Sequence, residues 1–95
     1  MAAKFEWNRR KAKSNRSKHQ ISFDEALTVF ADPLARIFDD TYHSTMEPRE
    51  IIIGHSVRRR LLLVCFVEKE DTIRIISARK ATRRERQDYE ENLKS

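Results

Sequence analysis

The sequence has 95 residues, which is enough for one domain with a modest hydrophobic core. Its 39% hydrophobic and 37% charged residues are typical of a water-soluble fold, and no apolar run is long enough to span a membrane. The basic N-terminal segment lacks the apolar stretch of a secretory signal, and the single cysteine, Cys65, cannot form an internal disulfide. We therefore expect one domain over residues 1–95 in a reducing, cytoplasmic compartment.

The charges are segregated along the chain. The net charge is +5, and residues 1–20 contain seven basic side chains against one acid. Residues 24–50 contain seven acids and two arginines, and basic clusters return at residues 58–60 and 79–86. This segregation favours a surface with one positive face, whose natural partner is a polyanion such as nucleic acid. A well-solvated surface, or a face for an acidic protein, is the alternative interpretation.

The N-terminal half predicts one strand and two helices. Residues 4–7 alternate charged and aromatic side chains, as a short strand does. Asn8 can cap a helix that runs to about Lys18, although Ala12 is the only aliphatic residue in it. The segment Ser22–Glu25 is a capping box for a second helix, which has apolar residues at helical spacing and ends at an Asp-Pro pair.

The C-terminal half predicts strands followed by a helix. Four strand-like runs cover residues 34–38, 50–54, 60–67 and 72–78. The third run is apolar on both faces, which is typical of a central strand. A second capping box, Thr82–Glu85, begins a charged helix that continues to about Asn92. We expect an α+β fold: an antiparallel β-sheet of about four to five strands, with two N-terminal helices and one C-terminal helix.

Several classes of site are disfavoured by the residue types present. The three histidines lack the spacing of metal ligands, and no glycine-rich loop is available to bind a nucleotide phosphate. Cys65, in the most apolar strand, is expected to be a buried structural thiol. Asp32, Asp39 and Asp40 are more simply interpreted as solvated acids than as Mg²⁺ ligands. We therefore expect no metal and no cofactor.

With those sites disfavoured, the chemically useful side chains that remain are those of lysine, arginine, histidine and tyrosine. These side chains can fill the roles that an RNA-cleaving site needs. RNA supplies its own nucleophile, the 2′-hydroxyl, so the protein needs a base, an acid and fixed positive charge around the phosphorane. His19 is a candidate acid or base, or simply a cation at the C-terminus of a helix. Strict alternation places Arg74 and Arg79 on opposite faces of a strand, and they converge only if the strand bulges near Ser77-Ala78.

A series of short motifs runs from Phe5 to about Tyr89 in a specific order and spacing. Its members are Phe5-Glu6-Trp7, Lys11, Asn15, Lys18-His19, Ser22-Phe23-Asp24-Glu25-Ala26, Val29-Phe30, Ile53-Gly54, Arg60-Leu61-Leu62, Arg74-Ile75-Ile76-Ser77-Ala78-Arg79 and the helix from Glu85 to Tyr89. This series resembles the BrnT family of ribonuclease toxins from bacterial type II toxin–antitoxin systems. Where the family usually has glycine this chain has Gln20, and it has Arg59 where glycine is frequent. Both look like turn positions that need a positive φ.

The resemblance implies a RelE-like fold and a metal-independent endoribonuclease that inhibits translation and growth. It also implies neutralisation by a BrnA-type antitoxin, and contact with DNA only through a toxin–antitoxin complex that represses its own promoter. A bacterial cytoplasmic location without membrane association is expected. The alternative is a non-catalytic module that binds RNA or pairs with an antitoxin to regulate transcription.

Carried over by position, the resemblance provides candidate site residues. The candidate catalytic residues are Lys18, His19, Arg74, Arg79 and Tyr89. Together with the basic segments, it suggests RNA contacts at Arg10, Lys11, His55, Arg58, Arg59 and Arg83. Within this set, Tyr89 is also a plausible packing residue with a solvated hydroxyl.

Overall fold

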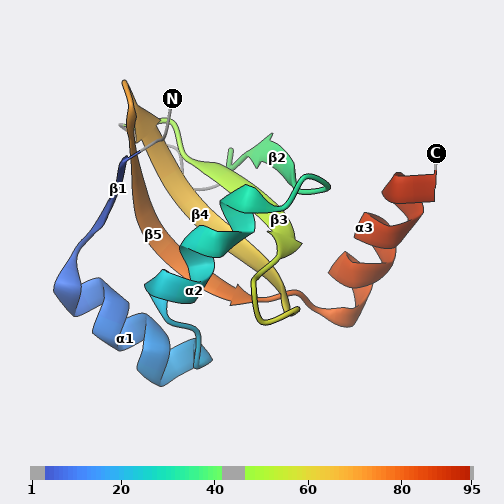
Figure 1. Ribbon diagram of the computed structural model, residues 1–95, viewed down its shortest axis with the longest axis horizontal. Coiled ribbons are helices and arrows are strands. Elements are labelled where there is room, and N and C mark those ends of the chain that lie inside the picture. Colours follow the sequence, from blue (N-terminus) through green and yellow to red (C-terminus); the bar gives the residue numbers. More distant parts are fainter. Residues whose placement is uncertain (1–3, 42–46, 95) are drawn as a thin grey trace.

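A five-stranded sheet with helices on both faces forms the computed structural model of the chain, which describes residues 4–41 and 47–94 (Figure 1). The elements are β1 (Lys4–Trp7), α1 (Arg9–His19), α2 (Phe23–Leu27), the 3₁₀ helix η1 (Thr28–Ala31), β2 (Arg36–Asp39), β3 (Glu50–His55), β4 (Leu61–Lys69), β5 (Thr72–Lys80) and α3 (Arg83–Lys94). The α+β class and the order of strands and helices agree with the sequence prediction. None of the described helices has the length and apolar character of a membrane span.

The sheet is mixed, which corrects the expectation of an antiparallel sheet. Its strand order is β1-β5-β4-β3-β2, and strands β2 to β5 form the expected antiparallel meander. The first strand lies beside the last and runs parallel to it, with Phe5 opposite Ile73 and Trp7 opposite Ile75. Parallel neighbours need a long connection, and here the helices and the whole meander provide it.

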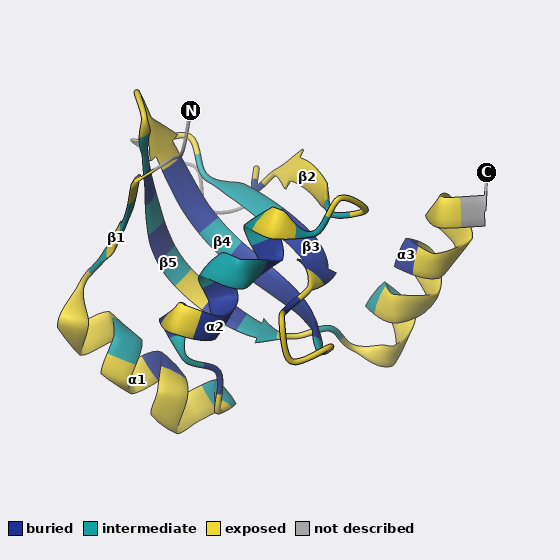
Figure 2. Cartoon of the chain, in the orientation of Figure 1, coloured by how far each residue is buried: buried dark blue, intermediate teal, exposed yellow. Residues whose placement is uncertain are grey.

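Most of the hydrophobic core lies between the sheet and the layer formed by α1, α2 and η1 (Figure 2). Its buried members are Ile21, Phe23, Ala26, Val29, Ile52, Leu62, Val64, Phe66, Ile73, Ile75 and Ala78. Phe30 meets Phe5 and Phe66 edge to face, with ring centroids 5.2 and 5.0 Å apart. Strand β4 contributes buried residues to both faces of the sheet, which confirms that it is a central strand.

A smaller cluster on the opposite face holds α3. Tyr89 packs there against Ile53, Leu61 and Leu63. The Arg36 guanidinium also donates to the carbonyl of Asn92 over 2.8 Å, which links β2 to the last turn of α3. The remainder of α3 is largely exposed (Figure 2). This leaves much of the α3-side face of the sheet accessible.

Among the described residues, three that are not glycine have a positive φ: Gln20 at 62°, Arg59 at 62° and Glu70 at 59°. The first two are the turn positions for which the sequence analysis expects a positive φ, so the predicted left-handed turns are confirmed. Gln20 ends α1, and its amide donates to Arg16 O over 2.9 Å. The left-handed Glu70, in the turn between β4 and β5, was not anticipated.

Candidate functional site

A bulge in β5 places two candidate arginines on the same face of the sheet. The pairing with β4 shifts between Ile75 and Ser77, so that Ile76 is an extra residue. Core residues before and after this bulge point toward α1 and α2, so Arg74 and Arg79 both project from the opposite face. The bulge required by the sequence argument is therefore present at Ile76.

Arg79 lines a cavity of about 240 Å³ on the α3 side of the sheet. The wall consists of Asp40, Arg49, Ile51, Leu63, Cys65, Ser77 and Arg79. Two guanidinium groups in one cavity suit an oxyanion such as a phosphodiester, because each can donate two parallel hydrogen bonds. Asp40 is buried and adds a carboxylate to the same wall.

The guanidinium of Arg79 is held by Glu85 in the first turn of α3. Its Nη1 and Nη2 donate to Oε1 and Oε2 over 2.8 and 2.9 Å. Glu85 also accepts from the Thr82 amide over 2.8 Å, and its own amide donates to Thr82 Oγ1 over 3.1 Å, so the predicted capping box is complete. The hydrogen bonds from Arg79 lower the pKa of Glu85 to about 2. A phosphate that binds Arg79 must therefore share the guanidinium with Glu85 or displace it.

Arg74 belongs to a second groove that adjoins the Arg79 cavity. Its Nη2 donates to Glu47 Oε1 over 2.5 Å, and Glu6 lies opposite it on β1. This groove is also lined by Lys11 of α1 and by Arg49. Because Arg49 lines both hollows, Lys11, Arg74 and Arg49 connect α1 to the Arg79 cavity, in a groove that Glu6 and Glu47 also line.

The remaining catalytic candidates lie outside the Arg79 cavity. Lys18 is exposed and His19 half-buried at the C-terminal end of α1, and neither lines the cavity or the adjoining groove. Tyr89 is 3% exposed, and its hydroxyl donates to Leu34 O over 3.2 Å. Burial raises the pKa of the Tyr89 phenol, so it stays protonated at neutral pH. Tyr89 lines a neighbouring hollow with Glu85, on the other side of Leu63.

Cys65 is only half-buried, because its thiol faces the Arg79 cavity rather than the core. The Sγ lies 3.7 Å from Asp40 Oδ2, to which it donates. Burial raises the pKa of Cys65 to about 11, so the group is a thiol rather than a reactive thiolate at neutral pH. The expectation of a buried thiol is corrected, because Cys65 is only partly buried, whereas its non-nucleophilic state follows from this environment.

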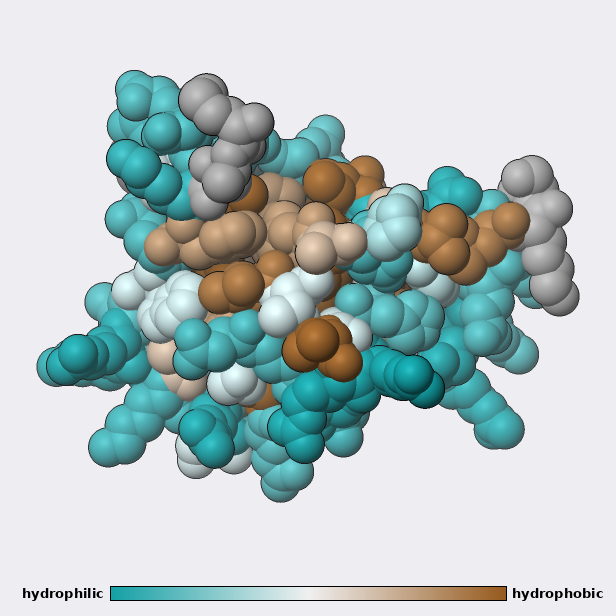
Figure 3. All heavy atoms as spheres, viewed as in Figure 1, coloured by the Kyte–Doolittle hydropathy of each residue, from teal (hydrophilic) through white to brown (hydrophobic). Residues whose placement is uncertain are grey.

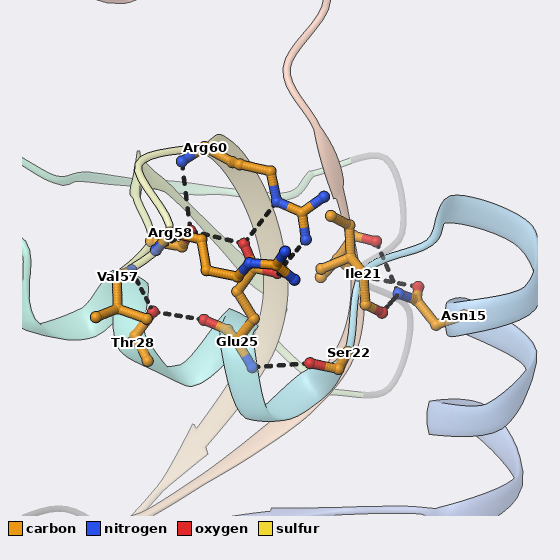
Figure 4. A network of polar contacts seen from close by, with 10 residues as sticks. Asn15, Ile21, Ser22, Glu25, Thr28, Val57, Arg58 and Arg60 are labelled. Atoms are coloured by element: carbon orange, nitrogen blue, oxygen red, sulfur yellow. Dashed lines mark hydrogen bonds and ion pairs between the residues drawn. The ribbon is translucent and has the colours of Figure 1, made fainter.

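The turn between β3 and β4 is fixed by the buried carboxylate of Glu25 (Figure 4). Arg60 donates to it from Nε over 2.9 Å and from Nη2, and Ser56 Oγ donates to it over 2.7 Å. The hydrogen bond from Arg60 lowers the pKa of Glu25. The first capping box is therefore only half formed: the Ser22 hydroxyl accepts from the Glu25 amide over 3.1 Å, but the carboxylate serves the turn instead.

The predicted RNA contacts are distributed over three parts of the surface. Arg10 and Lys11 are exposed on α1, and Arg83 is exposed at the start of α3. The third group, His55, Arg58 and Arg59, lies in and beside the turn that Glu25 holds. The amide of His55 donates to Asp32 Oδ2 over 2.8 Å, so the edge of this turn is also tied down.

Three residues of the Arg79 cavity were not assigned to a site by the sequence analysis: Arg49, Ser77 and Asp40. The expectation that Asp40 is a solvated acid was wrong, because its side chain is buried in the cavity wall. Arg49 and Ser77 could have been found, because residues two apart in a strand lie on the same face. Arg49 is two residues before Ile51, and Ser77 is two residues before Arg79. Among the described residues no group of three or more histidine, cysteine, aspartate or glutamate side chains is arranged to hold a metal ion. His43, one of the three histidines considered, lies outside the described residues.

The described residues form a small α+β protein with two arginines in one cavity of an accessible sheet face, and comparisons with known proteins identify its family. A family model described as "Ribonuclease toxin, BrnT, of type II toxin-antitoxin system" matches residues 7–85. The chain therefore belongs to the BrnT family of ribonuclease toxins, which implies an RNA substrate and an antitoxin partner.

A solved structure shares the fold. The 1.1 Å crystal structure of the Brucella abortus ribonuclease toxin BrnT superimposes with a TM-score of 0.66. The alignment covers 86% of this chain and 100% of that chain, at 21% sequence identity. A search of curated proteins produced no match.

Proposed function

We propose that the chain is a metal-independent endoribonuclease with a RelE-like fold, which inhibits translation in the bacterial cytoplasm by cutting RNA. The observation that carries the proposal is the pair of guanidinium groups, Arg49 and Arg79, in one cavity on an accessible sheet face. Fixed cations in such a cavity can stabilise the negative charge that builds on a phosphorane without a metal ion.

In the proposed reaction the 2′-oxygen of the RNA attacks the adjacent phosphorus, and the bond from phosphorus to the 5′-oxygen breaks. The products are a 2′,3′-cyclic phosphate and a 5′-hydroxyl. Arg79 and Arg49 bind the non-bridging oxygens, and Asp40, on the same cavity wall, is a candidate acceptor for the 2′-hydroxyl proton. The 5′-oxygen takes a proton from an acid. His19 does not line the Arg79 cavity, so it can fill this role only if the bound RNA brings the leaving oxygen to the end of α1.

Arg74, Lys18 and Tyr89 remain candidates, and each can act only under a condition set by its present contacts or position. Arg74 can bind a flanking phosphate in the adjoining groove if it exchanges its bond to Glu47. Lys18 can contact RNA from the exposed end of α1. Tyr89 takes part only if its hydroxyl leaves Leu34 O, so a supporting position under α3 is the simpler role.

The nature of the products tests the reaction. Purified protein should cut a single-stranded RNA to 5′-hydroxyl and 2′,3′-cyclic phosphate ends, and a single 2′-O-methyl group at the cleaved position should abolish cutting there. Arg79→Lys, which keeps the charge but loses the bidentate donors, should lower the rate by roughly 10²-fold or more. The matched variant Arg84→Lys, on the exposed face of α3, should cut at the original rate. Cleavage at the phosphate that follows a 2′-O-methyl nucleotide would contradict the 2′-hydroxyl as the nucleophile.

We further propose that a BrnA-type antitoxin neutralises the protein, and that only their complex contacts DNA, at its own promoter. The excess of basic residues on the chain supports an acidic partner that covers the Arg79 face. Expression of the chain alone should arrest growth, and co-expression of a short reading frame adjacent to its gene should restore growth. Harmless high-level expression of the chain alone contradicts this proposal.

A non-catalytic regulatory module is the second candidate, and one observation favours it. Both guanidinium donors of Arg79 that face Glu85 are occupied, and the Tyr89 hydroxyl is bonded to backbone. In that case the chain binds RNA or its antitoxin with salt-sensitive affinity but leaves RNA intact. The product assay above separates the two functions.

A further inference from the structure

The outer surface of α1 is strongly cationic. Six of its eleven residues are lysine or arginine, and all six are exposed: Arg9, Arg10, Lys11, Lys13, Arg16 and Lys18. Within residues 4–41 and 47–94 none of the six forms an ion pair with a carboxylate. Figure 3 shows long hydrophilic side chains projecting from the side of the molecule where α1 lies. We call these six residues the α1 cationic face.

In the first half of α1 this arrangement of charge destabilises the helix, whereas Arg16 and Lys18 in the last turn suit its negative end. The first turn of α1 contains no acid, so three cations sit at the positive end of the helix dipole. Arg9 and Lys13, and then Lys13 and Arg16, are like charges at the spacing where side chains on a helix meet. The helix is nevertheless formed, because Asn8 caps it and the buried Asn15 anchors it. Self-repulsion of this kind is relieved by an anionic partner.

The composition of the face favours nucleic acid over protein. Apart from its cations, α1 exposes the hydroxyl residues Ser14 and Ser17, and its single aliphatic residue, Ala12, is half-buried against the core. A protein partner would need apolar or aromatic side chains for the centre of an interface. Phosphate groups need only cations and hydroxyl donors, which are what the face supplies.

One member of the α1 cationic face, Lys11, adjoins the candidate site. Lys11 lines the same groove as Arg74 and Arg49, and Arg49 lines the cavity that contains Arg79. A strand whose scissile phosphate lies at Arg79 therefore passes Arg49, Arg74 and Lys11, beside the carboxylates of Glu6 and Glu47, as it leaves the cavity toward α1.

We propose that the α1 cationic face binds the phosphodiester backbone of the RNA that flanks the cleavage site. This inference rests on the proposed ribonuclease function and deepens it. The face contributes affinity for long RNA and takes no part in the chemical step. It reads no sequence, because contacts to phosphates position a nucleic acid without distinguishing its bases.

The test compares two triple variants that remove the same charge. One is Arg9→Gln/Lys13→Gln/Arg16→Gln on α1, and the control is Lys69→Gln/Arg84→Gln/Arg86→Gln, at exposed positions away from α1. The dissociation constant of a long 2′-O-methylated RNA is measured from about 50 to 200 mM salt. Because the α1 variant no longer neutralises three phosphates, its slope of log affinity against log salt should become shallower by about 2. The slope of the control should stay near that of the original protein.

Two further measurements, the melting temperature and the turnover on a short RNA, distinguish a loss of RNA binding from a loss of folding or of catalysis. The α1 variant should melt no lower than the original protein, because the substitutions remove repulsion and keep good helix formers. Its turnover on an RNA of only a few nucleotides should be unchanged. An unchanged salt slope in the folded α1 variant overturns the proposal while leaving ribonuclease activity intact. A shallower slope without cleavage by any variant supports the RNA surface and removes the proposed catalysis.

Discussion

The side chain of Asn15 bonds both polar groups of the Ala78 backbone. Its Nδ2 donates to Ala78 O over 2.9 Å, and the Ala78 amide donates to its Oδ1 over 3.1 Å. Strand β1 pairs with β5 only as far as Ile75, so Asn15 replaces a neighbouring strand where the sheet edge becomes free. The next residue is Arg79, and α1 thereby fixes the backbone that carries the central cation of the site.

Asn15→Ala should destabilise the protein by about 2–3 kcal/mol, because it leaves the Ala78 amide and carbonyl buried without a partner. The Ile21 carbonyl, which accepts from Nδ2 over 3.0 Å, loses its partner as well. Urea unfolding followed by circular dichroism measures the change. The neighbouring exposed Ser14→Ala should change stability by less than about 0.5 kcal/mol. Equal effects of the two substitutions would show that the anchor contributes nothing.

Gln20→Gly should stabilise the protein. Gln20 has a φ of 62°, where a side chain is strained by roughly 1–2 kcal/mol, and glycine recovers this at an entropic cost of up to about 1 kcal/mol. We expect a net gain of about 0.5–1 kcal/mol in thermal or urea unfolding. The matched control is Ser14→Gly in the middle of α1, which should lose roughly 0.5–1 kcal/mol. Destabilisation by Gln20→Gly would contradict the left-handed end of α1.

Gly54→Ala should destabilise the protein, because Ala35, Asp32 and Val29 pack closely against the Gly54 backbone. The φ of Gly54 is not positive, so its conformation does not itself require glycine. An added Cβ would lie 2.8 Å from Ala35 Cβ, 3.0 Å from Asp32 Oδ2 and 3.1 Å from Val29 Cγ1. Overpacking of this kind costs about 1–3 kcal/mol. Because Ala35 Cβ is the nearest atom, Ala35→Gly should cost less in the Gly54→Ala background than alone. A double-mutant cycle by urea unfolding checks this, and additive effects would indicate that the two residues do not meet.

The Arg79–Glu85 pair should make stability depend on pH in a defined window. The pKa of Glu85 is lowered from 4.5 to about 2, so between these values the unfolded chain binds more protons than the folded protein. The contribution of the pair is therefore fully present above about pH 4.5 and is lost as the pH falls toward 2.

Glu85→Gln should accordingly lower the Tm at neutral pH. The melting temperatures of the variant and of the original protein should converge as the pH falls through this window. The control Glu91→Gln, at an exposed position on α3, should remain parallel to the original protein throughout. A Tm difference for Glu85→Gln that is the same at every pH would show that Glu85 acts by packing and not through its charge.

Local features of the fold were predictable from the sequence because they depend on a few neighbouring residues. The cap at Asn8 and the box at Thr82–Glu85 are both formed, and the left-handed positions Gln20 and Arg59 follow from a departure from glycine in a family pattern. The parallel pairing of β1 with β5 was not predictable, because it joins residues 68 positions apart, such as Lys4 and Thr72, and depends on how the helices pack.

The candidate site was only partly predictable for the same reason. The bulge at Ile76 decides which face carries Arg74, and only pairing with β4 reveals it. Glu25 illustrates competition between local and distant partners. Its carboxylate accepts from the Arg60 guanidinium, which is 35 residues away in the sequence, and therefore does not complete the capping box with Ser22. The part played by Arg49 depends on a cavity built from three strands and is visible only in the folded chain.

The most direct test of a metal-free ribonuclease centred on Arg79 is cleavage of a long RNA in excess EDTA by the original protein and by Arg79→Ala. Both proteins are first shown to be folded and to bind RNA. We predict that the original protein cuts in EDTA and that Arg79→Ala does not. Intact RNA with the original protein, or cutting by Arg79→Ala at the original rate, would contradict the proposed function.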